Sequence, residues 1–227
     1  MKRWFLAPAI LLLGCGARVE KFVMPDQVTD FAVLYKANCS GCHGENGSTG
    51  AARPLNDPLF LAVIGKQTLG DVIANGVPKT AMPAFAKNGG GDLTDQQIGI
   101  LADQIEARWS RPREFGAVAL PLYSAALGDS NAGAAVFHRY CASCHSEEGT
   151  GGAKPGSVVD PSFLALASDQ SLRTTVIAGR SDQGSPDYRN YSPGHPMTPQ
   201  EISDVVAWLS SHRVVPMNLS QRGTKLP

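Results

Sequence analysis

The sequence lacks several features that would assign it to a large class of proteins. Its 227 residues include 20 basic and 20 acidic side chains, so the formal net charge is zero. Without a basic excess there is no broad attraction to nucleic acid, and we expect no nucleic-acid partner. No uninterrupted apolar run approaches the roughly 18–20 residues that span a bilayer as a helix, which excludes a polytopic membrane protein. With 43% hydrophobic and 18% charged residues, overall disorder is excluded as well.

No strand-like alternation competes with the helical patterns in the sequence. Gly (24) and Pro (16) are numerous without a repeat period, which indicates short helices joined by long loops. Domains commonly run to roughly 100–150 residues, so a chain of this length is comfortable for two small ones. The sequence therefore predicts an all-α protein with two compact units.

The N-terminus has the layout of an export signal. Two basic residues precede an apolar stretch that closes with Leu-Leu-Gly and Cys15. This ending resembles a bacterial lipobox, in which the Cys becomes the lipid-modified first residue; the alternative is an ordinary signal peptide that contains a Cys. We expect residues 1–14 to be removed, Cys15 to carry a lipid anchor, and residues 15–27 to tether an exported protein to a bacterial membrane, on its periplasmic or outer-surface side.

The other four cysteines form two pairs, and each pair is followed at once by a histidine. The two segments are Cys39-Ser40-Gly41-Cys42-His43 and Cys141-Ala142-Ser143-Cys144-His145. C-x-x-C-H is the attachment signature of c-type haem: the thiols lie about one helical turn apart and can reach the two vinyl groups, while the His ligates the iron. The alternatives are a thiol-disulfide oxidoreductase, which needs no adjacent His, and a zinc site, which requires both pairs to converge.

An internal repeat supports two haem domains. Residues 31–39 align with 133–141, and two downstream segments align at nearly the same spacing. Each repeat predicts a helix leading into C-x-x-C-H, a loop, a short helix that ends in Gly, a second loop and a final helix. Thr94 and Thr198 are the expected N-caps of the final helices, and Leu93 and Met197 precede them at the hydrophobic-staple position.

Each repeat resembles the class I cytochrome c family, over residues 28–112 (unit one) and 128–216 (unit two). Residues 113–127 then form a linker and 217–227 a tail. The resemblance implies two covalently bound haem c groups, each wedged between the first helix, the last helix and a methionine loop. The family usually places a small Gly on the first helix against an aromatic on the last.

This crossing pair differs between the two units. Unit two has Gly133 and Trp208 at the corresponding positions. In unit one they are Phe31 and Gln104, so either the bulky partner has moved to the first helix or Trp109 fills the place.

The sixth iron ligand also separates the units. Met82 follows Gly76 at the distance that the family uses for its axial Met, and His43 with Met82 is the expected ligand pair of the first haem. In unit two, the residue at the same distance after Gly179 is Ser185, whose hydroxyl is a poor ligand for haem iron. We expect His145 to be joined by Met197 or His195, or by neither, in which case the site is open or binds water.

The function that follows from these motifs is electron transfer. A dihaem cytochrome at a membrane surface would pass single electrons between redox partner proteins, and we expect no catalytic residues. One alternative is a haem enzyme, peroxidase-like or ligand-binding, that uses an open second haem. The other is a fixed cytochrome subunit of a larger respiratory or photosynthetic complex.

Overall fold

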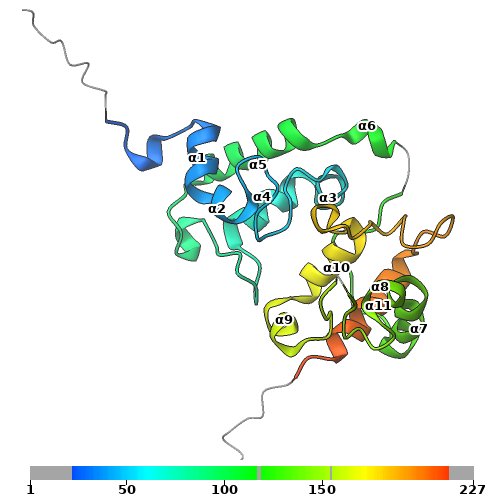
Figure 1. Cartoon of the computed structure of the whole chain (residues 1–227). Coiled ribbons are helices and arrows are strands. Elements are labelled where there is room, and N and C mark those ends of the chain that lie inside the picture. The colour runs from blue at the N-terminus through cyan, green and yellow to red at the C-terminus, as the bar shows by residue number, and fades with distance from the viewer. Residues whose placement is uncertain (1–21, 117–118, 154, 215–227) are drawn as a thin grey trace, which may run out of the picture.

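The computed structural model describes residues 22–116, 119–153 and 155–214. Within these ranges the regular structure is helical, and β-pairing is limited to two isolated bridges, Ala86–Leu93 and Arg180–Ser185 (Figure 1). No helix in the described part of the chain has the length and apolarity needed to cross a membrane. Cys15, the expected signal segment and residues 217–227 lie outside the described residues.

Unit one contains the helices that the repeat predicts, together with the further helix α3 and two short 3-10 helices. The 3-10 helix η1 (Pro25–Gln27) precedes α1 (Phe31–Asn38), α2 (Ser40–His43), α3 (Pro58–Ile64), α4 (Lys66–Asn75), η2 (Lys87–Gly89) and α5 (Asp95–Trp109). Thr94 caps α5 in a full capping box with Gln97, as expected. The unpredicted α3 begins because the Asp57 side chain accepts the backbone N–H groups of Leu59 and Phe60.

Unit two repeats this order of helices. It comprises α7 (Ser130–Tyr140), α8 (Ala142–His145), α9 (Pro161–Leu166), α10 (Asp169–Ala178), η3 (Ser181–Gln183) and α11 (Pro199–Ser211). Asp160 starts α9 as Asp57 starts α3, and Thr198 is the expected N-cap of α11, where it also forms a capping box with Glu201. The all-α prediction is therefore confirmed, and the sequence did not predict α3, α9 or the short α6 (Pro112–Phe115) at the start of the expected linker.

The first and last helices pack together in both units, but with different side chains. In unit two a β-carbon added at Gly133 would lie 2.7 Å from Trp208 Cβ, so the Gly allows α7 and α11 to approach closely. In unit one Trp109 packs edge-on against Tyr35, with 5.5 Å between ring centroids, and against Phe31 at 6.4 Å. Both alternatives expected for unit one are therefore present: Phe31 puts a bulky ring on the first helix, and Trp109 supplies an aromatic ring from the last.

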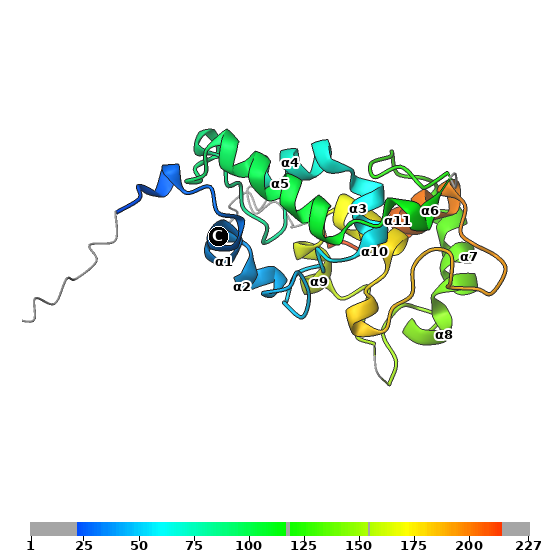
Figure 2. The same ribbon diagram turned by 90° about the horizontal axis from the view of Figure 1, so that it is seen from above.

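The two units meet through α3 and α10. Figures 1 and 2 both show these helices side by side, with α6 (Pro112–Phe115) leading out of unit one. Leu61 of α3 and Ile177 of α10 are fully buried, at 0% exposure. The loop that follows the first C-x-x-C-H segment lies against the end of α10, where Arg53 Nη2 donates to Gly179 O and Arg180 Nη2 donates to Ala52 O.

Candidate functional site

The first C-x-x-C-H segment forms a single short turn at the end of α1. The backbone carbonyl of Cys39 accepts hydrogen bonds from Cys42 N at 3.2 Å and from His43 N at 2.9 Å. Nδ1 of His43 donates to the carbonyl oxygen of Arg53 at 2.7 Å. This bond leaves Nε2 free to bind a metal and fixes the plane of the ring. Burial lowers the pKa of His43, so the imidazole is neutral at pH 7, as a metal ligand must be.

The second segment repeats this geometry. His145 N donates to Cys141 O at 3.0 Å, and Nδ1 of His145 donates to the carbonyl of Gly156 at 3.3 Å. No disulfide joins the four cysteines that the structure describes, and in each pair the first is better buried than the second. In the thiol form that precedes haem attachment, burial raises the pKa of Cys39 to about 11 and that of Cys141 to about 12.

These residues fit the cofactor that the motif implies. Two thiols on one turn and a neutral imidazole with a free Nε2 are the donor set for a covalently attached haem. Unit one also holds a buried donor: Nη1 of Arg53 makes no hydrogen bond to the residues that the structure describes. Such a group is costly unless it has an acceptor, and a carboxylate-bearing cofactor would supply one.

The loop after α4 presents Met82. Gly76 has φ = 68°, and a β-carbon there would lie within 2.7 Å of the backbone of Met82, Pro83 and Ala84. Only a residue without a side chain suits this close approach in the left-handed region. The loop is closed by Val77 N donating to Met82 O at 3.0 Å, and the Thr80 hydroxyl accepts Met82 N at 3.1 Å.

The loop after α10 begins and closes like the loop after α4, although it contains the 3-10 helix η3, and it places Ser185 where unit one has Met82. Gly179 has φ = 69°, and the main chain of Ser185 and Pro186 packs against it. Arg180 N donates to Ser185 O at 3.1 Å, as Val77 N does to Met82 O. The register predicted for these two loops therefore agrees with the backbone hydrogen bonds.

The two alternative ligands of unit two lie further along the chain. Met197 is 2% exposed, and its N–H donates to Tyr188 O at 2.9 Å. The N–H of Leu93 donates to Phe85 O at 2.9 Å in unit one, so Met197 occupies the Leu93 position at the start of the last helix. His195 is exposed on the preceding loop.

Two residues near these loops escaped the sequence reading. Tyr191 donates its hydroxyl proton to Val176 O at 3.2 Å, and hydrogen bonding to Ser185 is among the influences on its pKa, which burial raises. Arg53 reaches the second unit through its side chain. Neither side-chain contact recurs in the other unit, so aligning the two repeats could not have predicted it. Both contacts depend on how the loops fold.

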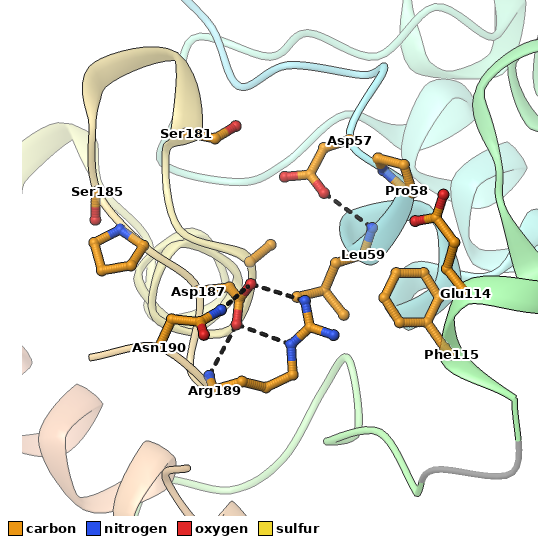
Figure 3. Close-up of a pocket in the computed structure, with 12 residues that line it drawn as sticks. Asp57, Pro58, Leu59, Glu114, Phe115, Ser181, Ser185, Asp187, Arg189 and Asn190 are labelled. Atoms are coloured by element: carbon orange, nitrogen blue, oxygen red, sulfur yellow. Dashed lines mark hydrogen bonds and ion pairs between the residues drawn. The ribbon is translucent and has the colours of Figure 1, made fainter. Parts of the chain in front are cut away.

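A cavity of about 380 Å³ lies between the units beside the Ser185 loop. Figure 3 shows Asp57 and Glu114 on one side of it and Ser185 on the other. Arg189 pairs with Asp187 at 2.8 Å inside this space. The loop that carries Ser185 thus borders a polar space at the junction of the units.

Two family models match the chain. The model described as "Cytochrome C oxidase, cbb3-type, subunit III" matches residues 26–104, and the model described as "Cytochrome c" matches residues 130–213. The cytochrome bc1 complex cytochrome c subunit of Corynebacterium diphtheriae is 26% identical over 97% of this chain and 82% of its own. The cbb3-type cytochrome c oxidase subunit FixP of Bradyrhizobium sp. is 29% identical over 65% of this chain. The match covers 50% of the length of the FixP subunit, so this chain spans about half of that relative.

Among solved structures, the Kuenenia stuttgartiensis reducing HAO-like protein complex Kustc0457/Kustc0458 aligns with a TM-score of 0.47 and 17% identity, covering 85% of this chain and 100% of that one. Cytochrome c6 of the diatom Phaeodactylum tricornutum aligns with a TM-score of 0.30 and 24% identity, covering 37% of this chain and 93% of that one.

Proposed function

Because the chain belongs to the c-type cytochromes, with two cytochrome c domains and two covalently bound haem c groups, we propose that it passes single electrons between redox partner proteins at a membrane surface. Haem c held by a neutral His takes up and releases one electron without any bond being made in a substrate. The chain's own role is to hold two such groups close together and to set their reduction potentials.

The observation that carries this proposal is the contact between the two sites. His43 is held by the carbonyl of Arg53, and the side chain of the same Arg53 donates to Gly179 O of unit two at 3.2 Å. Gly179 in turn begins the loop that carries Ser185. A single residue therefore links the proximal side of the first site with the loop that corresponds to the Met loop in the second, which suits two centres that exchange electrons.

We further propose that the two sites differ in ligation. His43 and Met82 would hold the first iron, whereas His145 would hold the second without a methionine at the Ser185 position, so that this iron is open or binds water. The burial of Met197 at the Leu93 position and the exposure of His195 support this choice. A Met/His pair raises the reduction potential, so the first site is expected to have the higher potential.

A potentiometric titration with and without carbon monoxide tests the proposal. The purified protein should show two reversible one-electron steps and bind about one carbon monoxide per two haems when reduced. Ser185→Met should abolish this binding and raise the lower potential. Met197→Leu, which copies unit one, is the matched control and should leave carbon monoxide binding unchanged. Strong binding that appears only after Met197→Leu would instead identify Met197 as the ligand.

The proposed location is the periplasmic or outer-surface side of a bacterial membrane, with a lipid at Cys15. Export suits covalent haem attachment and an N-terminal segment with a signal layout. Docking would use local patches around each site, since basic and acidic residues are equal in number.

A second candidate function is that of a fixed subunit in a respiratory complex. It is favoured by the alignment of 97% of this chain with a protein named as a bc1 complex cytochrome c subunit. Native gel electrophoresis of membranes gently solubilised from the source cells separates the two roles. A free carrier should migrate as a small species, and a fixed subunit should comigrate with a large complex.

A further inference from the structure

Arg53 lies at the junction of the two units and touches both haem-binding regions. Its carbonyl oxygen accepts the Nδ1 proton of His43 at 2.7 Å. Its Nη2 donates to Gly179 O at 3.2 Å and, more weakly, to Thr175 Oγ1 at 3.4 Å. The guanidinium therefore lies where the loop after the first C-x-x-C-H meets the end of α10, the junction seen in Figure 2.

The described side chains neutralise the charge on Arg53 only in part. Its side chain is 15% exposed, Nη1 makes no hydrogen bond to the described residues, and its carboxylate partner, Asp57, is 4.0 Å away. The neighbouring Arg180, by contrast, is paired with Asp182 at 2.8 Å. Because arginine stays protonated at neutral pH, the junction holds a fixed positive charge that water screens only partly.

A fixed positive charge favours the reduced state of a nearby iron. Reduction converts one ferric iron to one ferrous iron with one electron from the mediator, so the site becomes less positive by one charge. Removing that repulsion stabilises the reduced form, and the effect extends further in a partly buried region than in water. The guanidinium sits against both units, so both irons should experience its charge.

We propose that Arg53 is a shared positioning residue whose buried charge raises the reduction potentials of both haem sites. This inference rests on the proposed electron-transfer function. It adds that the two potentials are set partly by one residue at the junction, and not only by the ligands inside each unit.

The test is a potentiometric titration of the full two-haem protein carrying Arg53→Gln. Both midpoint potentials should fall, and Arg53→Lys, which keeps the charge, should restore most of the shift. Arg108→Gln removes an exposed arginine that stacks on Phe31 and serves as the control for a general loss of positive charge. It should change neither potential appreciably.

A second variant predicts a shift of opposite sign. Asp57→Asn removes the carboxylate that faces Arg53 but keeps an oxygen that can cap α3, since Asn is as good an N-cap as Asp. Both potentials should then rise. This variant keeps the inference testable if Arg53→Gln fails to retain its haems.

Three results would overturn the inference. A fall confined to one potential would make Arg53 a local residue, equal falls in Arg53→Gln and Arg53→Lys would assign the effect to geometry, and no fall would remove the effect altogether. A wild-type protein without two reversible one-electron steps would instead refute the proposed function. The two failures are therefore distinguishable.

Discussion

Replacing Gly133 with Ala should loosen the helix crossing that supports the second haem-binding turn. The added β-carbon would lie 2.7 Å from Trp208 Cβ and would overlap the carbonyl oxygen of Asp204. Carbon atoms normally meet at about 3.5–4.0 Å, so α7 and α11 must separate by roughly 1 Å. Overpacking of this kind costs about 1–3 kcal/mol. The change matters for function because Cys141, the first cysteine of the second C-x-x-C-H segment, is the C-cap of α7.

Gly99 provides a matched control for this substitution. It lies in α5, is exposed, and would place a β-carbon in open space with no atom within 4 Å. Gly99→Ala should stabilise its helix by about 0.5–1 kcal/mol, because Ala loses less backbone entropy than Gly on folding. Gly133→Ala should gain the same stabilisation from helix propensity. The difference between the two variants in the change of unfolding free energy therefore gives the packing cost, about 1–3 kcal/mol.

The assay is urea unfolding of the oxidised protein, followed by far-ultraviolet circular dichroism and by haem absorbance. Each variant is compared with the wild-type transition of the unit in which it lies. Gly133→Ala should shift its midpoint to lower urea, and Gly99→Ala should shift its own slightly higher. If the two variants change stability equally, the close approach of α7 and α11 does not limit the size of residue 133.

Three further predictions concern anchoring, attachment and ligation. Cys15→Ala should release the cytochrome from the membrane into the soluble fraction, and unchanged membrane retention would contradict lipidation. Replacing Cys141 and Cys144 with Ala should lower the intact mass by one haem while the other haem remains; loss of both would show that attachment in the two units is not independent. Met82→Ala should lower the potential of the first haem and remove the weak near-infrared absorption of Met-ligated ferric haem; an unchanged spectrum would exclude Met82 as the ligand.

Local signals in the sequence were enough to predict the helices that carry the repeat. Thr94 and Thr198 each combine a capping hydroxyl with an apolar residue just before it, and both are N-caps as expected; the structure adds that each forms a capping box with the Gln or Glu three positions later. The glycines that end α4 and α10 were equally readable, because each marks a backbone conformation that other residues rarely adopt. These features depend only on a few neighbouring residues, so a short segment of sequence is enough to predict them.

The junction between the units could not be predicted in this way. Arg53 and Gly179 are 126 positions apart, and their contact depends on how two folded units meet. The helix α3 was missed for a related reason: residues 58–64 are almost uniformly apolar, so they show no helical periodicity. That composition is explained by the position of α3, which packs against α4 and α5 within unit one and against α10 across the junction.

The loops that begin at Gly76 and at Gly179 are alike in backbone conformation at their ends but differ in the side chain that each presents. Gly76 and Gly179 have nearly equal φ angles, 68° and 69°, and each loop is closed by an equivalent N–H to carbonyl bond. Two loops that begin and close alike therefore present Met82 in one unit and Ser185 in the other. Because a thioether binds haem iron and raises its potential whereas a serine hydroxyl does not, the two loops are expected to hold their irons at different potentials. Ser185→Met should bring the lower potential toward the higher one, and it should do so without changing the fold, since the loop that receives the new side chain starts and closes as the Met82 loop does.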